Sequence, residues 1–209
     1  MIPGKYGSVD EQDIGFQGNH PDKQRIGFKR KGDGFLVDTY CLKGGYTYSF
    51  YLRNHPSPKK FLEKNYSPLH SRVLSLFEQL PSQNYKVGLD DLFISARFAK
   101  ASEMLPQKVM IHGVARQKGR GVPKCVEQEV VASKNLLHKV RGTVKVAVLE
   151  GDEDCKNLVA CSIYDTKPVY LISNACEEVK WVRKERKLWH KDKNQYVNVP
   201  FHRLNLINE

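Results

Sequence analysis

The stretch YKVGLDDLFISARFAKASEMLPQKVMIHGVA, residues 85–115, places a helical segment between two apolar runs. Tyr85–Leu89 and Val109–Ala115 are short runs rich in apolar and β-branched residues, which predicts two strands. Between them, Ala96 and Ala99 lie on one side of a helical repeat and can face a sheet. This alternation of strand, helix and strand is typical of an α/β sheet with helices packed on its faces.

The residues before this unit predict more strands and one helix. Ser8–Phe16 predicts a first strand, and Phe35–Cys41 with the alternating run Tyr46–Arg53 predicts a hairpin that has one buried face. Ser67 is a candidate N-cap and Pro68 a first helical residue. One apolar stripe follows in that helix: Leu69, Val73, Leu76, Phe77 and Leu80. The core candidates of the resulting mixed α/β sheet are Val37, Phe50, Leu76, Phe77, Val87 and Ile111.

Other parts of the chain are less regular. Gln17–Gly34 has neither helical nor strand periodicity and predicts a long surface connection, which in a compact domain is often functional. Val130–Val140 predicts a weak helix. Short strands are then expected at Thr143–Leu149, Leu158–Tyr164 and Val169–Ser173, and a hairpin at Val179–Arg183 and Tyr196–Val199. The chain therefore divides into an α/β core over 1–126 and a β-rich region over 127–209.

Composition limits the classes of function. The chain has 209 residues, and 34 Lys and Arg against 23 Asp and Glu give a net charge of +11, which suits a nucleic-acid partner. Its longest apolar runs are far shorter than the about 20 residues that span a bilayer, and no secretory signal is visible at the N-terminus. Five cysteines without CxxC spacing predict free thiols in a reducing compartment and give no indication of zinc.

Acidic residues are concentrated at two predicted strands. Asp10, Glu11 and Asp13 occur in the first one, and Asp90 and Asp91 follow directly after Tyr85–Leu89. Ligands in open α/β sheets bind at the carboxyl ends of strands, so carboxylates from two neighbouring strands could share a hard divalent cation. In the alternative interpretation, Asp10 is a solvated turn residue and Asp90 or Asp91 caps the next helix. The sequence pattern alone leaves both open.

Two basic segments are candidates for contact with a polyanion. The loop 116–121 carries Arg116, Lys118 and Arg120 between glycines, and these side chains are candidate phosphate contacts. The segment 180–193 interleaves basic residues, among them Lys184 and Arg186, with two tryptophans, which suits a surface that follows a nucleic-acid strand. For both segments the alternative is a solvated surface whose charges only aid solubility. No Walker loop, GxGxxG motif or local nucleophile–histidine signature occurs.

Several blocks, in order along the chain, together resemble the piggyBac transposase family. Val9–Gln12 with Gly15-Phe16 resembles its opening block, and Gly88–Ser95 resembles its DNxFTS signature. Gly113–Arg116 through Gly121–Pro123 is similar to its GTxRxNRKGLP stretch. Further similar blocks are Gly34–Cys41 with Gly45–Tyr48, Arg141-Gly142 and Tyr164–Ser173. The resemblance extends from about residue 6 to the C-terminus.

The resemblance implies a ribonuclease-H-like fold with a β insertion before its last helix. It also implies cutting and joining of DNA with Mg²⁺ or Mn²⁺ held by three aspartates, of which Asp10 matches the first and Asp90 the second. The family's third aspartate lies in a YNxxMGGVD segment that this sequence does not contain. Asp13 and Asp91 also depart from the family pattern, which has an apolar residue and an asparagine there.

These departures lead to two functional hypotheses. In the first, the chain is a C-terminally truncated transposase-derived domain whose metal site is incomplete, so that it is inactive by itself. In the second, it is a non-catalytic DNA- or protein-binding module of the same descent. Without the last helix, one sheet face is expected to expose apolar surface, which a protein partner or a second copy could cover. The resemblance and a DNA substrate imply a location in the nucleus.

Overall fold

The computed structural model describes residues 3–26, 32–81, 84–116, 120–131, 141–150, 152, 155, 157–176, 181–190 and 193–204. The N-terminal elements are β1 (Tyr6–Gly15), β2 (Gln24–Ile26), β3 (Gly32–Leu42), β4 (Thr47–Leu52), α1 (Lys59–Leu62), α2 (Pro68–Glu78), β5 (Tyr85–Leu89), α3 (Ala96–Glu103) and β6 (Val109–Ala115). Then follow a 3₁₀ turn η1 (Lys124–Val126), β7 (Val144–Val148), β8 (Val159–Tyr164), β9 (Pro168–Ser173), β10 (Trp181–His190) and β11 (Gln195–Leu204).

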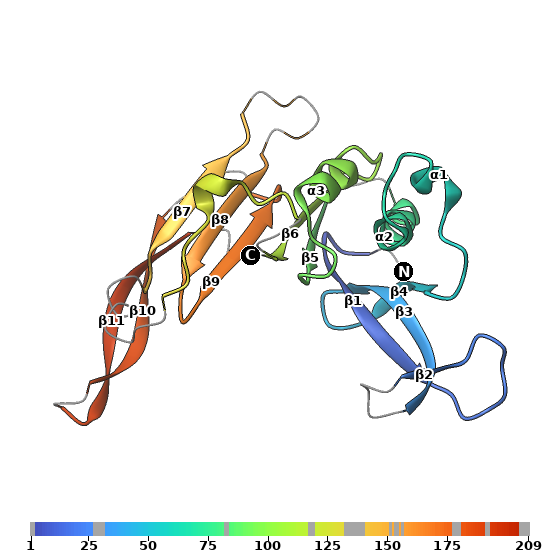
Figure 1. Ribbon diagram of the computed structural model, residues 1–209, viewed down its shortest axis with the longest axis horizontal. Coiled ribbons are helices and arrows are strands. Elements are labelled where there is room, and N and C mark those ends of the chain that lie inside the picture. The colour runs from blue at the N-terminus through green and yellow to red at the C-terminus, as the bar shows by residue number, and fades with distance from the viewer. Residues whose placement is uncertain are drawn as a thin grey trace.

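The centre of the molecule is a mixed sheet (Figure 1). Its order is β2-β3-β1-β5-β6-β9-β8-β7, and β4 pairs with β3 outside this path. β1, β5 and β6 run parallel to one another, whereas β3 is antiparallel to β1 and β9 is antiparallel to β6. The strands β7–β9 therefore extend the same sheet beyond β6, while β10 and β11 form a separate two-stranded sheet.

The helices cover one face of the sheet. α2 begins as the sequence predicts, because the Ser67 hydroxyl accepts a hydrogen bond from the His70 N–H at 3.2 Å and Pro68 occupies the first turn. Leu76 and Phe77 on α2 are fully buried together with Val87 on β5 and Ile111 on β6. Val37 on β3 is also buried, at 1% exposed, but on the other face of the sheet. These core predictions are confirmed.

The opposite face carries exposed apolar side chains. Phe50 on β4, predicted to be in the core, is 54% exposed, so that prediction was wrong. Strand alternation and register place Tyr6 and Ile14 of β1 and Val114 of β6 on the same face as Phe50, and all are exposed. The alternation of β4 did reveal two faces, but the helices that cover one of them come from elsewhere in the chain. This face therefore carries single exposed apolar side chains, while a continuous apolar surface stays a prediction.

Other local predictions need correction. The stretch Gln17–Gly34 contains the short strand β2, which pairs with β3. Asp91 does not cap α3; the Ser95 hydroxyl does, accepting a hydrogen bond from the Phe98 N–H at 3.1 Å. β10 and β11 form the predicted hairpin but are longer than expected. The helix predicted at Val130–Val140 falls largely on residues 132–140, which lie outside the described residues.

No helix in the described part of the chain is both long and apolar enough to cross a membrane. The five cysteines are free thiols, and Cys125 is the exposed one.

Candidate active site

The parallel pairing of β1 and β5 brings two aspartates together. In this register Val9 lies opposite Leu89, so the next residues on the two strands are Asp10 and Asp90. Both are exposed, and strand alternation directs Asp10 away from the helix-covered face that buries Val9. One oxygen of each carboxylate accepts a hydrogen bond from the next backbone N–H, of Glu11 and of Asp91, in both cases at 2.7 Å. The two sequence-predicted residues thus follow paired positions of adjacent strands, and we refer to them as the carboxylate pair.

The pleat of β1 divides the acidic cluster seen in the sequence. Glu11 and Asp13 lie on the opposite face from Asp10, because successive side chains of a strand alternate. Glu11 forms an ion pair with Arg53, which follows β4. Of the three acids in β1, only Asp10 therefore lies on the face of the sheet that the helices do not cover.

A buried ion network supports β1 from the helix side. Asp38 on β3 is 0% exposed, and its Oδ1 accepts hydrogen bonds from Arg53 Nε at 2.8 Å and Nη2 at 2.6 Å. Its other oxygen accepts one from Arg72 Nε of α2 at 2.7 Å. Because Asp38 lies opposite Glu11, the network joins β1, β3, α2 and the turn after β4. Sequence reasoning missed this group, since its members are far apart in the chain.

Asp91 has a different partner from Asp90. Arg116, directly after β6, donates from Nε to Asp91 Oδ2 at 2.8 Å and from Nη2 to Asp91 Oδ1 at 3.3 Å. The hydrogen bond from Arg116 lowers the pKa of the Asp91 carboxyl, and the same bond, together with the charges of Asp91 and Asp90, raises the pKa of Arg116. Arg116 therefore carries its positive charge close to the Asp90 carboxylate.

The carboxylate pair fits part of a divalent-cation site. Two exposed carboxylates on adjacent strands offer the oxygen ligands that Mg²⁺ and Mn²⁺ prefer. Among the described residues, no group of three or more His, Cys, Asp or Glu side chains is arranged to hold a metal ion. Asp10 and Asp90 therefore have the chemistry of two ligands of such an ion, but do not make a complete site by themselves.

The candidate phosphate contacts lie in two places. Arg116 and Arg120 flank the loop after β6, whereas Lys118 lies outside the described residues. Lys184 and Arg186 lie on β10, opposite Phe201 and Val199 of β11. The structure thus places Arg116 beside the carboxylate pair and the two β10 residues in the separate hairpin.

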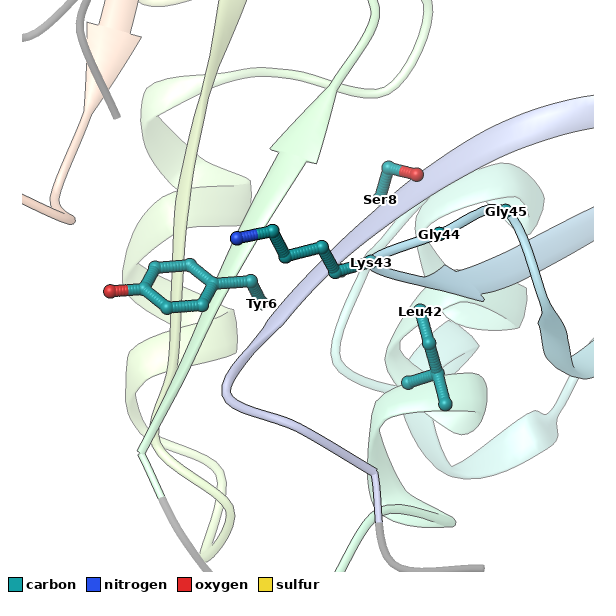
Figure 2. A pocket seen from close by; sticks show the side chains of 7 residues that line it. Tyr6, Ser8, Leu42, Lys43, Gly44 and Gly45 are labelled. Carbon is teal, nitrogen blue, oxygen red and sulfur yellow. The ribbon is translucent and has the colours of Figure 1, made fainter.

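A shallow pocket near the start of β1 lies apart from the carboxylate pair. It is formed by Tyr6 and Ser8 of β1 and by the turn after β3, which includes Lys43 (Figure 2). The Lys43 ammonium lies 5.9 Å from the centre of the Tyr6 ring, and Figure 2 shows the lysine side chain running back toward that ring. Without an acidic residue in its lining, this pocket offers no oxygen cluster for a metal.

The sheet has the strand order β4-β3-β1-β5-β6, in which β3 is antiparallel to its neighbours. One acid lies on β1 and another follows the adjacent strand β5. These features define a ribonuclease-H-like α/β protein. The family model described as Transposase IS4 matches residues 1–202, and the chain belongs to this transposase family. No curated protein matches the chain.

A solved structure supports the fold assignment. The fold is similar to that of a piggyBac transposase solved by cryo-EM in a synaptic complex with hairpin DNA, with a TM-score of 0.64 and 20% sequence identity. The match covers 93% of this chain and 36% of the matched chain, so this chain spans about a third of that transposase. The resemblance to piggyBac transposases and the ribonuclease-H-like fold are thereby confirmed.

Proposed function

We propose that the chain is part of the catalytic core of a transposase that cuts and joins DNA with the help of divalent metal ions, and that Asp10 and Asp90 are two of the metal ligands. The observation that supports this proposal is the register of β1 and β5, in which Val9 pairs with Leu89, the residues directly before Asp10 and Asp90. In a functional two-metal site at least one further ligand is needed, and in this proposal it comes from a part of the transposase outside the described residues.

The chain's own residues have separate roles in this proposal. Asp10 and Asp90 hold the cation, and the Asp38–Arg53–Glu11 network keeps β1 in place behind Asp10. Arg116 offsets negative charge beside Asp90 while it is held by Asp91. When bound, the metal ions activate a water or a 3′-hydroxyl and stabilise the leaving oxygen of the DNA strand.

DNA contacts complete the proposal. In this proposal, backbone phosphates are contacted by Arg116, Lys118 and Arg120 after β6 and by Lys184 and Arg186 on β10. The net charge of +11 supports such contacts. The matched transposase was solved with DNA, which supports the same class of partner here. The proposal also includes three further points. The chain divides into a core over 1–126 and a β-rich region over 127–209. A protein partner or a second copy covers the exposed sheet face, and the protein is located in the nucleus.

Metal binding is tested directly by titrating the chain with Mn²⁺ and following backbone amide signals by NMR. We expect paramagnetic broadening centred on the amides of Asp10, Glu11, Asp90 and Asp91, because these flank the two carboxylates. Asp10→Asn and Asp90→Asn should each remove it. Asp13→Asn is the matched control, since it removes an acid from the same strand but from the other face. Broadening that survives Asp10→Asn, or that is lost equally in the control, would contradict the proposed ligands.

DNA cleavage separates the proposed enzyme from a non-catalytic binding module. Nicking of supercoiled DNA that needs Mn²⁺ and disappears in Asp90→Asn is the result expected of a catalytic transposase core. If Asp10→Asn and Asp90→Asn change neither Mn²⁺ binding nor nicking, and DNA affinity falls only with salt, the protein is a binding module instead.

A further inference from the structure

A concave pocket beside the helices collects positive charge from separate segments of the chain. It is lined by Tyr66 and Ser67 before α2, by His70 and Arg97 in the first turns of α2 and α3, and by Arg120 in the loop after β6. None of the described residues that line the pocket is acidic. The lining therefore brings two arginines together without a carboxylate among them.

Arg97 is held in a fixed place at this pocket. Its Nη2 donates a hydrogen bond to the Lys64 carbonyl at 3.1 Å, and its guanidinium carbon lies 4.9 Å from the centre of the Tyr66 ring. A guanidinium over an aromatic ring is a favourable cation–π arrangement. The side chain is thus positioned before any ligand arrives, while most of its N–H donors stay available.

The backbone of Arg120 is held by a hydrogen bond, and its guanidinium group remains available to a ligand. Its carbonyl accepts a hydrogen bond from the Ala96 N–H at 2.9 Å, which ties the loop to the start of α3. The next residue, Gly121, has a φ of +77°, and a Cβ there would come within 2.7 Å of Ala96 Cβ, so glycine permits this close approach. No hydrogen bond or ion pair joins the Arg120 side chain to another described residue.

His70 lines the same pocket as Arg97 and Arg120. Its Nε2 donates to the Phe93 carbonyl at 2.9 Å, and its ring stacks on Phe98 at 4.6 Å between centroids. Burial lowers the pKa of His70, and the positive charges of Arg120 and Arg97 lower it further.

From these contacts we infer that the pocket between α2, α3 and the β6 loop binds a phosphate group of the DNA backbone through Arg97 and Arg120. The inference rests on the proposed DNA-cutting function and adds a contact that is separate from the β10 residues Lys184 and Arg186. Guanidinium forks match phosphate oxygens, and the amino-terminal ends of α2 and α3 add positive potential. A phosphate held here positions the duplex without reading its sequence.

The pocket is tested first with inorganic phosphate as the probe, in an NMR titration of the chain. Phosphate should shift the amide signals of Tyr66, Ser67, Ala96 and Gly121, which line or adjoin the pocket. The shifts should vanish in Arg120→Ala, whose side chain makes no described hydrogen bond that the fold would lose. Absence of shifts at these amides, or shifts that persist in Arg120→Ala, would overturn the inference.

The second arm uses a duplex DNA of random sequence and measures the dissociation constant at several salt concentrations. Arg97→Ala and Arg120→Ala should each weaken binding about tenfold, and each should reduce the salt slope by roughly 0.9. Arg25→Ala is the control, because it removes one exposed arginine from β2 at the far edge of the sheet. Equal losses in all three variants would mean a general charge effect and would overturn the inference.

The two arms separate failure of the pocket from failure of the proposed function. If the unaltered chain binds duplex DNA but Arg120→Ala changes neither affinity nor salt slope, the pocket assignment is wrong and the DNA-binding proposal stands. If the chain binds inorganic phosphate in the pocket but no DNA, the DNA-backbone assignment is wrong and the proposed function fails with it. Thermal unfolding of Arg97→Ala, with Arg97→Lys as a second variant, shows whether its loss of affinity reflects lost folding.

Discussion

Asp38→Asn is expected to lower the free energy of unfolding by about 3–5 kcal/mol, because it removes the buried negative charge that compensates two arginines. The side chains of Arg72 and Arg53 are only 10% and 21% exposed, and both donate to the Asp38 carboxylate. Asparagine keeps the volume of the site, so the loss reports charge and hydrogen bonding rather than packing. Urea unfolding measured by circular dichroism gives the value.

Asp33→Asn is the matched control for this prediction. Asp33 also lies on β3, but it is 52% exposed and its ion pair with Lys23 spans 3.8 Å. A pair of this kind contributes little, so the control should stay within about 0.5 kcal/mol of the unaltered protein. If Asp38→Asn is as mild as Asp33→Asn, the network does not stabilise β1 behind Asp10, and its supporting role in the proposed site has to be abandoned.

Gly113→Ala is the second change with a large expected effect. A Cβ on Gly113 would come within 2.1 Å of the Leu89 carbonyl oxygen and 3.3 Å of Ile94 Cδ1. The oxygen belongs to the backbone of β5 and cannot rotate away, so β5 and β6 have to separate near Asp90. We expect a loss of roughly 1–3 kcal/mol in the free energy of unfolding, as for other overpacked cores.

The same variant should also disturb the carboxylate pair, because Leu89 directly precedes Asp90. Mn²⁺ broadening at the Asp90 and Asp91 amides is expected to weaken while the protein is still folded. Gly4→Ala is the control: its added Cβ meets nothing within 4 Å, so both stability and Mn²⁺ binding should be unchanged. A Gly113→Ala protein with normal stability and normal Mn²⁺ broadening would show that the β5–β6 contact tolerates displacement.

The sequence predicts those features whose causes lie within a few residues of one another. Ser67 and Pro68 begin α2 as expected, because capping of a helix end is a local hydrogen bond. The apolar stripe that includes Val73, Leu76 and Phe77 correctly indicates a buried helix face. For α3 the sequence analysis considered Asp90 or Asp91 as the cap and did not consider Ser95, whose hydroxyl caps the helix. Asp91 instead binds Arg116, a residue that is distant in the sequence.

Tertiary structure alone decided which face is covered, which acids meet and where the arginines gather. The alternation in β4 indicates that Phe50 shares one face of the strand with every second residue. The packing of α2 and α3 decides that the helices cover the opposite face. The sequence pattern left a shared site of Asp10 and Asp90 as one of two interpretations, which the family resemblance favoured. The register of Val9 with Leu89 brings the two residues to neighbouring positions. Arg97 and Arg120 converge only because α3 and the loop after β6 fold against each other. Backbone and capping preferences act over a few residues, whereas strand register and charge clustering are set by contacts between segments far apart in the chain.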